Sequence, residues 1–162
     1  MKNSNENLSS LKINDEKIIV ISGALKINSS LNSINLENNN IGDEGIKYLS
    51  ESLKTNSSLK EIDLFNHNIG DEGANYILDS LSFNNSITKI DLKDNFKINE
   101  NLKKKIYLIV EENLKNSKII KQIKLSSIVL VKNKMKNLIK FNKTFKFKKI
   151  LKKENKSRKR RI

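Results

Sequence analysis

The chain of 162 residues contains no cysteine, a single histidine and no long apolar run. The absence of cysteine excludes disulfides and thiolate metal sites, and it is compatible with a reducing compartment. The first ten residues are polar, and the longest apolar runs, 18–21 and 128–131, are far too short to span a bilayer. We therefore expect a cytoplasmic protein, or a nuclear one if the source is eukaryotic, with no signal peptide or transmembrane segment.

Acidic residues are almost absent from one end of the chain. Residues 115–162 hold sixteen lysines and three arginines against the single acid Glu154, a net charge of +18. Residues 1–114 carry a net charge of −4, so the overall value of +14 describes neither part. The sequence predicts a mildly acidic body and a strongly basic tail, which need separate explanations.

What the sequence does contain is a repeat of 28 residues. Residues 28–55 and 56–83 are identical at 16 of 28 aligned positions, and both contain the motifs Asn-Ser-Ser-Leu and Ile-Gly-Asp-Glu-Gly. A fixed period of this length is typical of a solenoid, in which each copy is one structural unit stacked on the next. Solenoids usually present a surface to a partner, so the period favours a binding protein over an enzyme.

Each copy changes its apolar spacing halfway along. The first apolar residues alternate with polar ones, which predicts a short strand with one buried face, and later ones have the spacing of a helix. We expect Gly42 and Gly70 at the helix starts, with the acids that follow them favoured by the helix dipole. Asn56 and Asn84 are expected to end the helices in the left-handed conformation. The predicted buried positions are Leu31, Ile34, Leu36, Ile46, Leu49, Leu53; Leu59, Ile62, Leu64, Ala74, Ile77, Leu81; and Ile87, Ile90, Leu92.

The period also predicts how the solenoid begins and ends. Residues 8–27 align with the later copies as a truncated first unit with a vestigial strand. The third full unit has one inserted residue, so that Ile98 takes the place of Ile69. A helix over about 99–115 then has one apolar face and a charged outer face, as the end of a solenoid requires. That apolar face is predicted to hold Leu102, Ile106, Ile109 and Val110.

These residues resemble the leucine-rich repeat family, in the ribonuclease-inhibitor-like subtype also found in NOD-like receptors and Ran GTPase-activating proteins. The pattern LxxLxLxxNxL is matched twice almost perfectly and a third time loosely. The resemblance covers about residues 8–115 and implies an α/β solenoid, a short horseshoe with parallel strands on its concave side and helices on its convex side. A basic low-complexity tail over 116–162, partly helical or disordered, would follow. The matching residues are Leu31, Ile34, Leu36, Asn39, Ile41; Leu59, Ile62, Leu64, His67, Ile69; and Ile87, Ile90, Leu92, Asn95, Ile98.

His67 occupies a position where the family pattern has asparagine. We expect its ring N–H to donate to a buried loop carbonyl, as the asparagine amide would. No second histidine exists for a metal site, and no nucleophile or base stands at a recognisable spacing. The sequence therefore predicts no enzyme, no catalytic residue, no metal and no cofactor.

The resemblance places the polar strand positions on the concave surface, where we expect a protein partner of unidentified nature rather than a small-molecule substrate. The face grades from neutral through acidic to mixed charge, and Phe65 is its only large apolar residue. An exposed aromatic beside acids suits a contact with a basic or amphipathic protein segment, although plain solvated strand residues would look the same. The predicted partner-binding residues are Ser33, Asn35, Glu37, Glu61, Asp63, Phe65, Lys89, Asp91 and Lys93.

The basic tail admits three interpretations. Its lysines, interleaved with Phe141, Phe145 and Phe147, suit binding to nucleic-acid phosphates or to an anionic membrane. The closing cluster resembles a nuclear-import signal. The tail also consists almost entirely of residues with A/T-rich codons, which fits a drifted extension without a selected role. The basic cluster is Lys156, Arg158, Lys159, Arg160 and Arg161.

Three functional hypotheses follow. The first is a non-catalytic interaction module that binds a protein through its concave face. The alternative is a protein associated with nucleic acid or an anionic membrane through its tail. The third, a GTPase regulator, rests on the Ran-related resemblance alone.

Overall fold

The structure is a computed structural model that describes residues 4–158, with side chains described for residues 4–138. Strands and helices alternate along the chain, and the four strands form one parallel sheet in the order β1-β2-β3-β4. This confirms the predicted α/β solenoid. The elements are β1 (Ser4–Asn7), α1 (Asp15–Ile27), β2 (Leu31–Asn35), α2 (Asp43–Leu53), β3 (Glu61–Asp63), α3 (Asp71–Phe83), β4 (Lys89–Asp91) and α4 (Glu100–Arg158).

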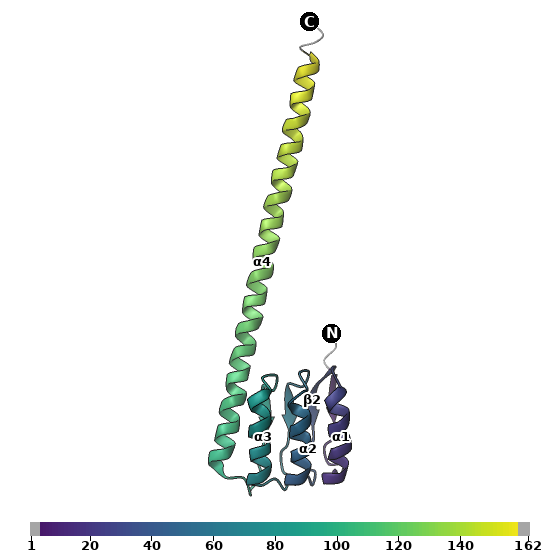
Figure 1. Cartoon of the computed structure of the whole chain (residues 1–162), viewed down its shortest axis with the longest axis vertical. Helices are drawn as coiled ribbons and strands as arrows, with labels where there is room; N and C mark the ends of the chain where they lie inside the picture. Colours follow the sequence, from purple (N-terminus) through teal and green to yellow (C-terminus); the bar gives the residue numbers. More distant parts are fainter. Residues whose placement is uncertain (1–3, 159–162) are drawn as a thin grey trace. The chain divides into compact units, whose positions relative to one another are not determined.

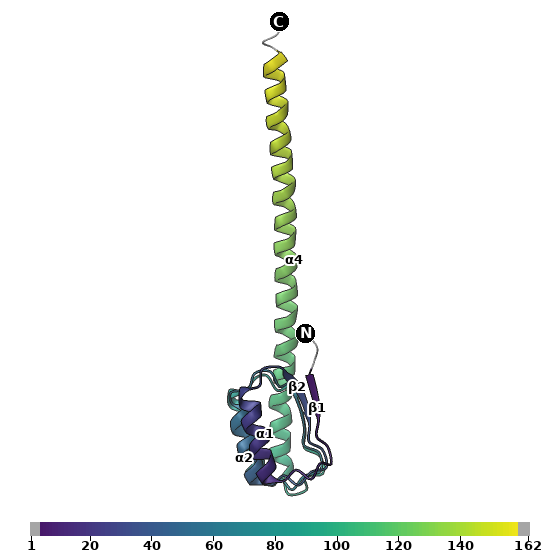
Figure 2. The same ribbon diagram turned by 90° about the vertical axis from the view of Figure 1, so that its right-hand side faces the viewer.

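The chain divides into two compact units, one ending at Ser117 and the other beginning at Lys118. We call the first the repeat domain and the second the C-terminal unit. In the repeat domain α1, α2 and α3 lie side by side (Figure 1), and the sheet lies on the opposite side from these helices (Figure 2). Residues 100–117 of α4 belong to the repeat domain.

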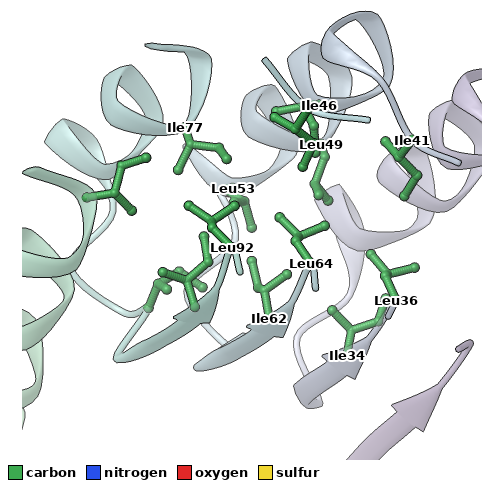
Figure 3. Packing of buried hydrophobic residues seen from close by; sticks show 14 of the residues in the cluster. Ile34, Leu36, Ile41, Ile46, Leu49, Leu53, Ile62, Leu64, Ile77 and Leu92 are labelled. Atoms are coloured by element: carbon green, nitrogen blue, oxygen red, sulfur yellow. The ribbon is translucent and has the colours of Figure 1, made fainter. Parts of the chain in front are cut away.

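The repeat domain has one core between its sheet and its helices. All fifteen apolar positions predicted from the period are buried, each with at most 7% of its surface exposed. Strand residues Ile34, Ile62 and Ile90 are aligned by the sheet register, so identical positions of successive copies stack on each other. Figure 3 shows side chains from the sheet meeting Ile46 and Leu49 of α2. The repeat therefore folds as one continuous core rather than as separate units.

The prediction that the first unit has only a vestigial strand is wrong, because β1 spans Ser4–Asn7 and is longer than β3 or β4. β1 has four residues and pairs with β2 through an irregular start between Ser4 and Asn5. Ile13, Ile18 and Leu25 are buried in the same core as the later repeats. β1 thus covers the edge of β2.

The prediction that Asn56 and Asn84 are left-handed is wrong. Asn84 is extended, with φ −104° and ψ 112°, and Asn56 is not among the described residues with positive φ. The left-handed residues include Asn38, Asn66 and Asp94, which lie 28 residues apart in the turns after the strands. Asparagine and aspartate tolerate this conformation better than other residues that carry a side chain.

The side chains of Asn56 and Asn84 join successive repeats. The Asn56 amide donates to the carbonyl oxygens of Leu25 at 2.7 Å and Asn28 at 3.0 Å. The Asn84 amide donates in the same way to Leu53 and Asn56 at 2.6 and 2.8 Å. These bonds reach carbonyls at the end of the helix in the preceding repeat, where backbone C=O groups have few partners within the helix.

The acids at the helix starts also connect neighbouring repeats. Asp43 Oδ1 accepts hydrogen bonds from the backbone N–H groups of Gly70 and Gly73, at 2.7 and 3.0 Å. Asp15 accepts in the same way from Gly42 of the next repeat at 2.7 Å. Gly42 and Gly70 precede their helices as predicted but have no side chain that could cap them. Each carboxylate therefore caps the following helix as well as lying in the first turn of its own.

The first turns of α4 close the C-terminal end of the core. Ile106 and Val110 are buried, while Leu102 and Ile109 are partly buried against the core, as predicted. The Tyr107 hydroxyl accepts a hydrogen bond from the Leu92 N–H at 3.1 Å. In the preceding repeats the equivalent N–H donates to the next strand, so the tyrosine replaces a missing strand.

The predicted helix end near Lys115 is wrong, because α4 continues to Arg158. Residues 116–158 contain neither glycine nor proline, the residues that most often end a helix. The 28-residue repeat pattern is lost in this stretch, but the stretch contains no helix-breaking residue. None of the helices that the structure describes has a stretch long and apolar enough to cross a membrane.

Candidate functional site

The nine residues predicted for partner binding form three rows across β2, β3 and β4, on the sheet positions that alternate with the core. We call this surface the concave face. The register aligns Ser33 with Glu61 and Lys89 in the first row, and Asn35 with Asp63 and Asp91 in the second. Backbone bonds just beyond the strands, from Asn38 to Phe65 and from Asn66 to Lys93, extend the same pairing to a third row. The third row consists of Glu37, Phe65 and Lys93.

The first row is the most exposed. Lys89 Nζ lies 3.6 Å from Glu61 Oε2, and 70% and 48% of these two side chains are exposed. An ion pair between solvated side chains contributes little to stability. Both charges are therefore available to a partner at small cost to the fold.

The second row has a structural role that the sequence pattern did not suggest to us. Asn35 Oδ1 accepts from the Glu37 N–H at 2.8 Å, and Asp63 and Asp91 accept from the N–H groups two residues later, both at 2.9 Å. Each side chain thus forms an Asx turn that ends its strand. The recurrence of asparagine or aspartate at one position of three copies was the available signal.

Phe65 is partly buried rather than fully exposed. It is not among the partly buried apolar side chains that pack against the core. Its neighbours in the row are the acid Glu37 and the base Lys93, so the ring lies between opposite charges. The most exposed aromatic in the described part of the chain is Phe96, with 84% of its surface accessible, and it is not one of the nine.

A cavity of about 200 Å³ lies on the concave face, between the first and second rows. This volume is below the range usual for small-molecule sites, about 300–1,000 Å³. Three carboxylates and one lysine contribute to its lining. Among the residues that the structure describes, no group of three histidine, cysteine, aspartate or glutamate side chains is placed to hold a metal ion. The lining residues are Ser33, Ile34, Asn35, Glu61, Ile62, Asp63, Lys89 and Asp91.

His67 is a buried member of a polar ladder behind the concave face. Its Nε2 lies 2.9 Å from the Leu36 carbonyl oxygen, and its Nδ1 accepts from the Ile41 N–H at 3.3 Å. This network assigns the neutral tautomer protonated at Nε2, and it confirms the predicted bond to a loop carbonyl. Burial lowers the pKa of His67, and the nearby Asp63 carboxylate opposes that shift only in part.

The asparagine positions of the ladder differ from His67 in one bond. Asn39 donates to the carbonyls of both Leu8 and Leu36, and Asn95 donates to those of both Leu64 and Leu92. A neutral imidazole has only one N–H. His67 therefore bonds the preceding repeat but not the carbonyl of its own turn.

The basic tail is described only in part. Every side chain from residue 118 to residue 138 is exposed. Lys156 and Arg158 lie in the backbone range of α4, but their side chains, like those of Phe141, Phe145 and Phe147, are outside the described set. Lys159, Arg160 and Arg161 lie outside the described residues altogether.

Comparison with known proteins identifies the repeats. The family model described as "Leucine Rich repeat" matches residues 28–50 and 55–78. The chain thus carries leucine-rich repeats, and the repeat domain has the fold that such repeats build. The ribonuclease-inhibitor-like subtype stays a prediction.

Solved structures match the chain at low sequence identity. One is leiomodin-1 actin-binding site 2, with a TM-score of 0.66 and 20% identity over 77% of this chain and 72% of that one. Another is the C-terminal domain of tropomodulin from Caenorhabditis elegans, with a TM-score of 0.49 and 12% identity over 75% of this chain and 90% of that one. No curated protein matches the chain.

Proposed function

We propose that this chain is a non-catalytic protein–protein interaction module whose concave face binds a basic or amphipathic segment of a partner protein. The observation that carries the proposal is the alignment of the first two rows, which brings carboxylates of two repeats, among them Glu61 and Asp63, to one cavity. Phe65 lies in the third row of the same face. Aromatic side chains in partly desolvated surroundings often dominate binding energy at interfaces.

The charges support a cationic partner segment. Glu61, Asp63 and Asp91 line the cavity with Lys89 as the single base, and the Lys89 charge is shared with Glu61. Complementary charge raises the rate of encounter and disfavours partners of the wrong sign. Leiomodin-1 has an actin-binding site on the same fold, but at 20% identity the likeness extends to the fold alone. The partner is therefore proposed by its chemistry and not by name.

Two phenylalanine substitutions test the proposal. The full chain, Phe65→Ala and Phe96→Ala are immobilised, and the proteins that each retains from a cell extract are quantified. We expect Phe65→Ala to lose captured proteins by about tenfold or more, the size of a typical hot spot. Phe96→Ala, which removes a more exposed aromatic outside the face, is expected to keep them.

Charge and folding controls complete the test. Glu61→Gln removes one carboxylate that has no bond within the fold apart from its exposed ion pair, and we expect it to weaken the same captures. Loss of the helical circular-dichroism signal in Phe65→Ala would place that ring in the folding core. Equal losses in the Phe65 and Phe96 variants would place binding elsewhere, and either result contradicts the proposal.

A further inference from the structure

Residues 118–138 of α4 combine two properties that the repeat domain does not share. Ten of these 21 residues are large and apolar, and six are lysines with no acid among them. All ten apolar side chains are exposed, with between 52% and 60% of their surface accessible. We call residues 118–138 the apolar-basic segment. Its apolar residues are Ile119, Ile120, Ile123, Leu125, Ile128, Val129, Leu130, Val131, Met135 and Leu138.

The helical spacing gathers most of each kind on a separate side. Ile119, Ile123 and Leu130 follow each other at intervals of four and seven residues, which places them on one face of a helix. Lys121, Lys132 and Lys136 lie on the other side by the same geometry, together with Leu125 and Val129, whereas Lys124 and Lys134 fall among the apolar residues. The turn over 128–131 is apolar all round, so the apolar surface is widest in the middle of the segment.

Two kinds of occupant satisfy only one of these properties. Nucleic-acid phosphates would pair with the lysines but leave the apolar side chains in water, and the segment has neither the arginine nor the aromatic residues that stack on bases. A second copy of the helix would cover the apolar residues but bring twelve lysines together without an acid, and like charges repel.

A membrane surface with anionic lipids satisfies both properties. Helices of this kind lie in the interface plane, with apolar side chains at the boundary of the acyl chains and lysines at the headgroups. The aliphatic stem of lysine allows its ammonium to reach the headgroups from a partly buried backbone. The hydrogen bonds of the backbone are made within the helix, so its entry into the interface leaves few polar groups without a partner.

We propose that the apolar-basic segment is an interfacial helix that binds the surface of an anionic lipid bilayer. The lysines contact the anionic headgroups, and Ile123, Leu130 and the residues of the 128–131 turn enter the acyl boundary. The proposal does not depend on the partner bound by the concave face. It accounts for the apolar residues as well as the charge.

Vesicle flotation with the full chain tests this proposal. The probes are phosphatidylcholine vesicles with and without a third of phosphatidylserine. We expect binding to the vesicles that contain phosphatidylserine and little binding to phosphatidylcholine alone. The double variant Ile123→Ser, Leu130→Ser keeps every charge, and it should weaken binding at least tenfold because two large apolar side chains no longer enter the lipid. Lys121→Gln and Lys132→Gln should each weaken it about fivefold.

A matched control and three contrary results decide the outcome. Val20→Ser removes an apolar side chain of α1 that is 75% exposed, and it should leave vesicle binding unchanged. Unchanged binding by the Ile123→Ser, Leu130→Ser variant would show attraction through charge alone and overturn the proposal. Tighter binding to a DNA or RNA oligonucleotide than to the vesicles would overturn it in favour of nucleic acid. Self-association in sedimentation, lost in that double variant, would overturn it in favour of a second copy.

Discussion

At the scale of single residues, asparagine serves four separate purposes in this fold. Asn35 ends a strand through an Asx turn, and Asn38 takes the left-handed conformation of the next turn. Asn39 binds loop carbonyls of two successive repeats. Asn56 satisfies carbonyls at the end of a helix in the preceding repeat. Asparagine suits the last two tasks because its amide donates hydrogen bonds, whereas aspartate performs the first two equally well in other repeats.

His67 should make the stability of the repeat domain depend on pH. Its pKa in the folded state lies below the ordinary value of about 6.5, so the unfolded chain binds the proton more readily. The free energy of unfolding should therefore be greatest above about pH 6.5 and fall as the pH decreases below it. Urea unfolding at several pH values, followed by circular dichroism, measures this.

The matched variant is His67→Asn, which restores the residue found at the same position of the neighbouring repeats. It should flatten the pH dependence between neutral pH and the range where carboxylates titrate. An equally steep loss in both proteins would show that His67 does not control it. The Asp63 carboxylate, whose charge favours protonation of His67 and so raises its pKa, is unchanged in both proteins.

At the scale of elements, the close approach of neighbouring helices depends on glycine. A Cβ on Gly73 of α3 would lie 2.6 Å from Asp43 Oδ1 and 2.8 Å from Ile69 Cγ2. Asp43 cannot move away without losing its bonds to Gly70 and Gly73. The aspartate of one Gly-Asp-Glu-Gly motif therefore caps the next helix, and the second glycine of the following motif leaves room for that carboxylate.

A pair of glycine substitutions separates this packing effect from helix propensity. Gly73→Ala should destabilise the repeat domain by roughly 1–3 kcal/mol, the usual cost of overpacking. Gly23→Ala, in α1 with nothing within 4 Å of the added Cβ, should stabilise it by about 0.5–1 kcal/mol. Chemical unfolding of both variants measures the difference, and stabilisation by Gly73→Ala would contradict the proposed close approach.

Most of the elements could be predicted because the period repeats the apolar spacing of strand and helix. The positions of Ile34, Ile62 and Ile90 in the core follow from that spacing alone. The conformation of Asn56 could not be predicted, because its partners Leu25 and Asn28 lie in another repeat and a local rule does not include them. The length of α4 was missed because the loss of a repeat period does not itself end a helix.

The candidate site shows the same division. Alternation along the strands was enough to assign residues such as Glu61 and Asp63 to one face. The Asx turn formed by Asp63 required the backbone geometry of the strand end. The partial burial of Phe65 depends on its neighbours across the sheet. The sequence predicts which residues these neighbours are but not how much of the ring they cover.

At the scale of the whole molecule, the core found among the side chains of residues 4–138 lies in the repeat domain. The buried apolar cluster begins at Ile13 and ends at Val110, and every side chain of the apolar-basic segment is exposed. The two parts therefore differ in what stabilises them. Packing stabilises the first, whereas the described side chains of the second lie at the surface.

Truncation tests this division. A chain that ends after Ser117 should unfold cooperatively at nearly the melting temperature of the full chain, as measured by circular dichroism. A chain that ends after Asn99 loses the buried Ile106 and Val110, each worth about 1.5–3 kcal/mol, which is much of the stability of a small domain. We expect that shorter chain to be largely unfolded. A lower melting temperature for the chain ending at Ser117 would show that the repeat domain needs the rest of α4.

The ladders that join one repeat to the next also bear on how such a chain grows. Carbonyls at the end of each unit accept hydrogen bonds from an asparagine amide of the next unit, as with Asn84. An aspartate of each unit caps the helix of the next unit, as with Asp43. Both kinds of bond span an interval of about 28 residues. Duplication of a whole unit within the gene would bring its own donors and acceptors and find matching ones on both sides. The single residue inserted before Ile98 is absorbed in the turn, because Asp71 still accepts a hydrogen bond from the Asn99 N–H at the start of the next helix at 2.6 Å. Duplication of a complete copy is thus the change that keeps all of these bonds, for evolution and equally for a designer.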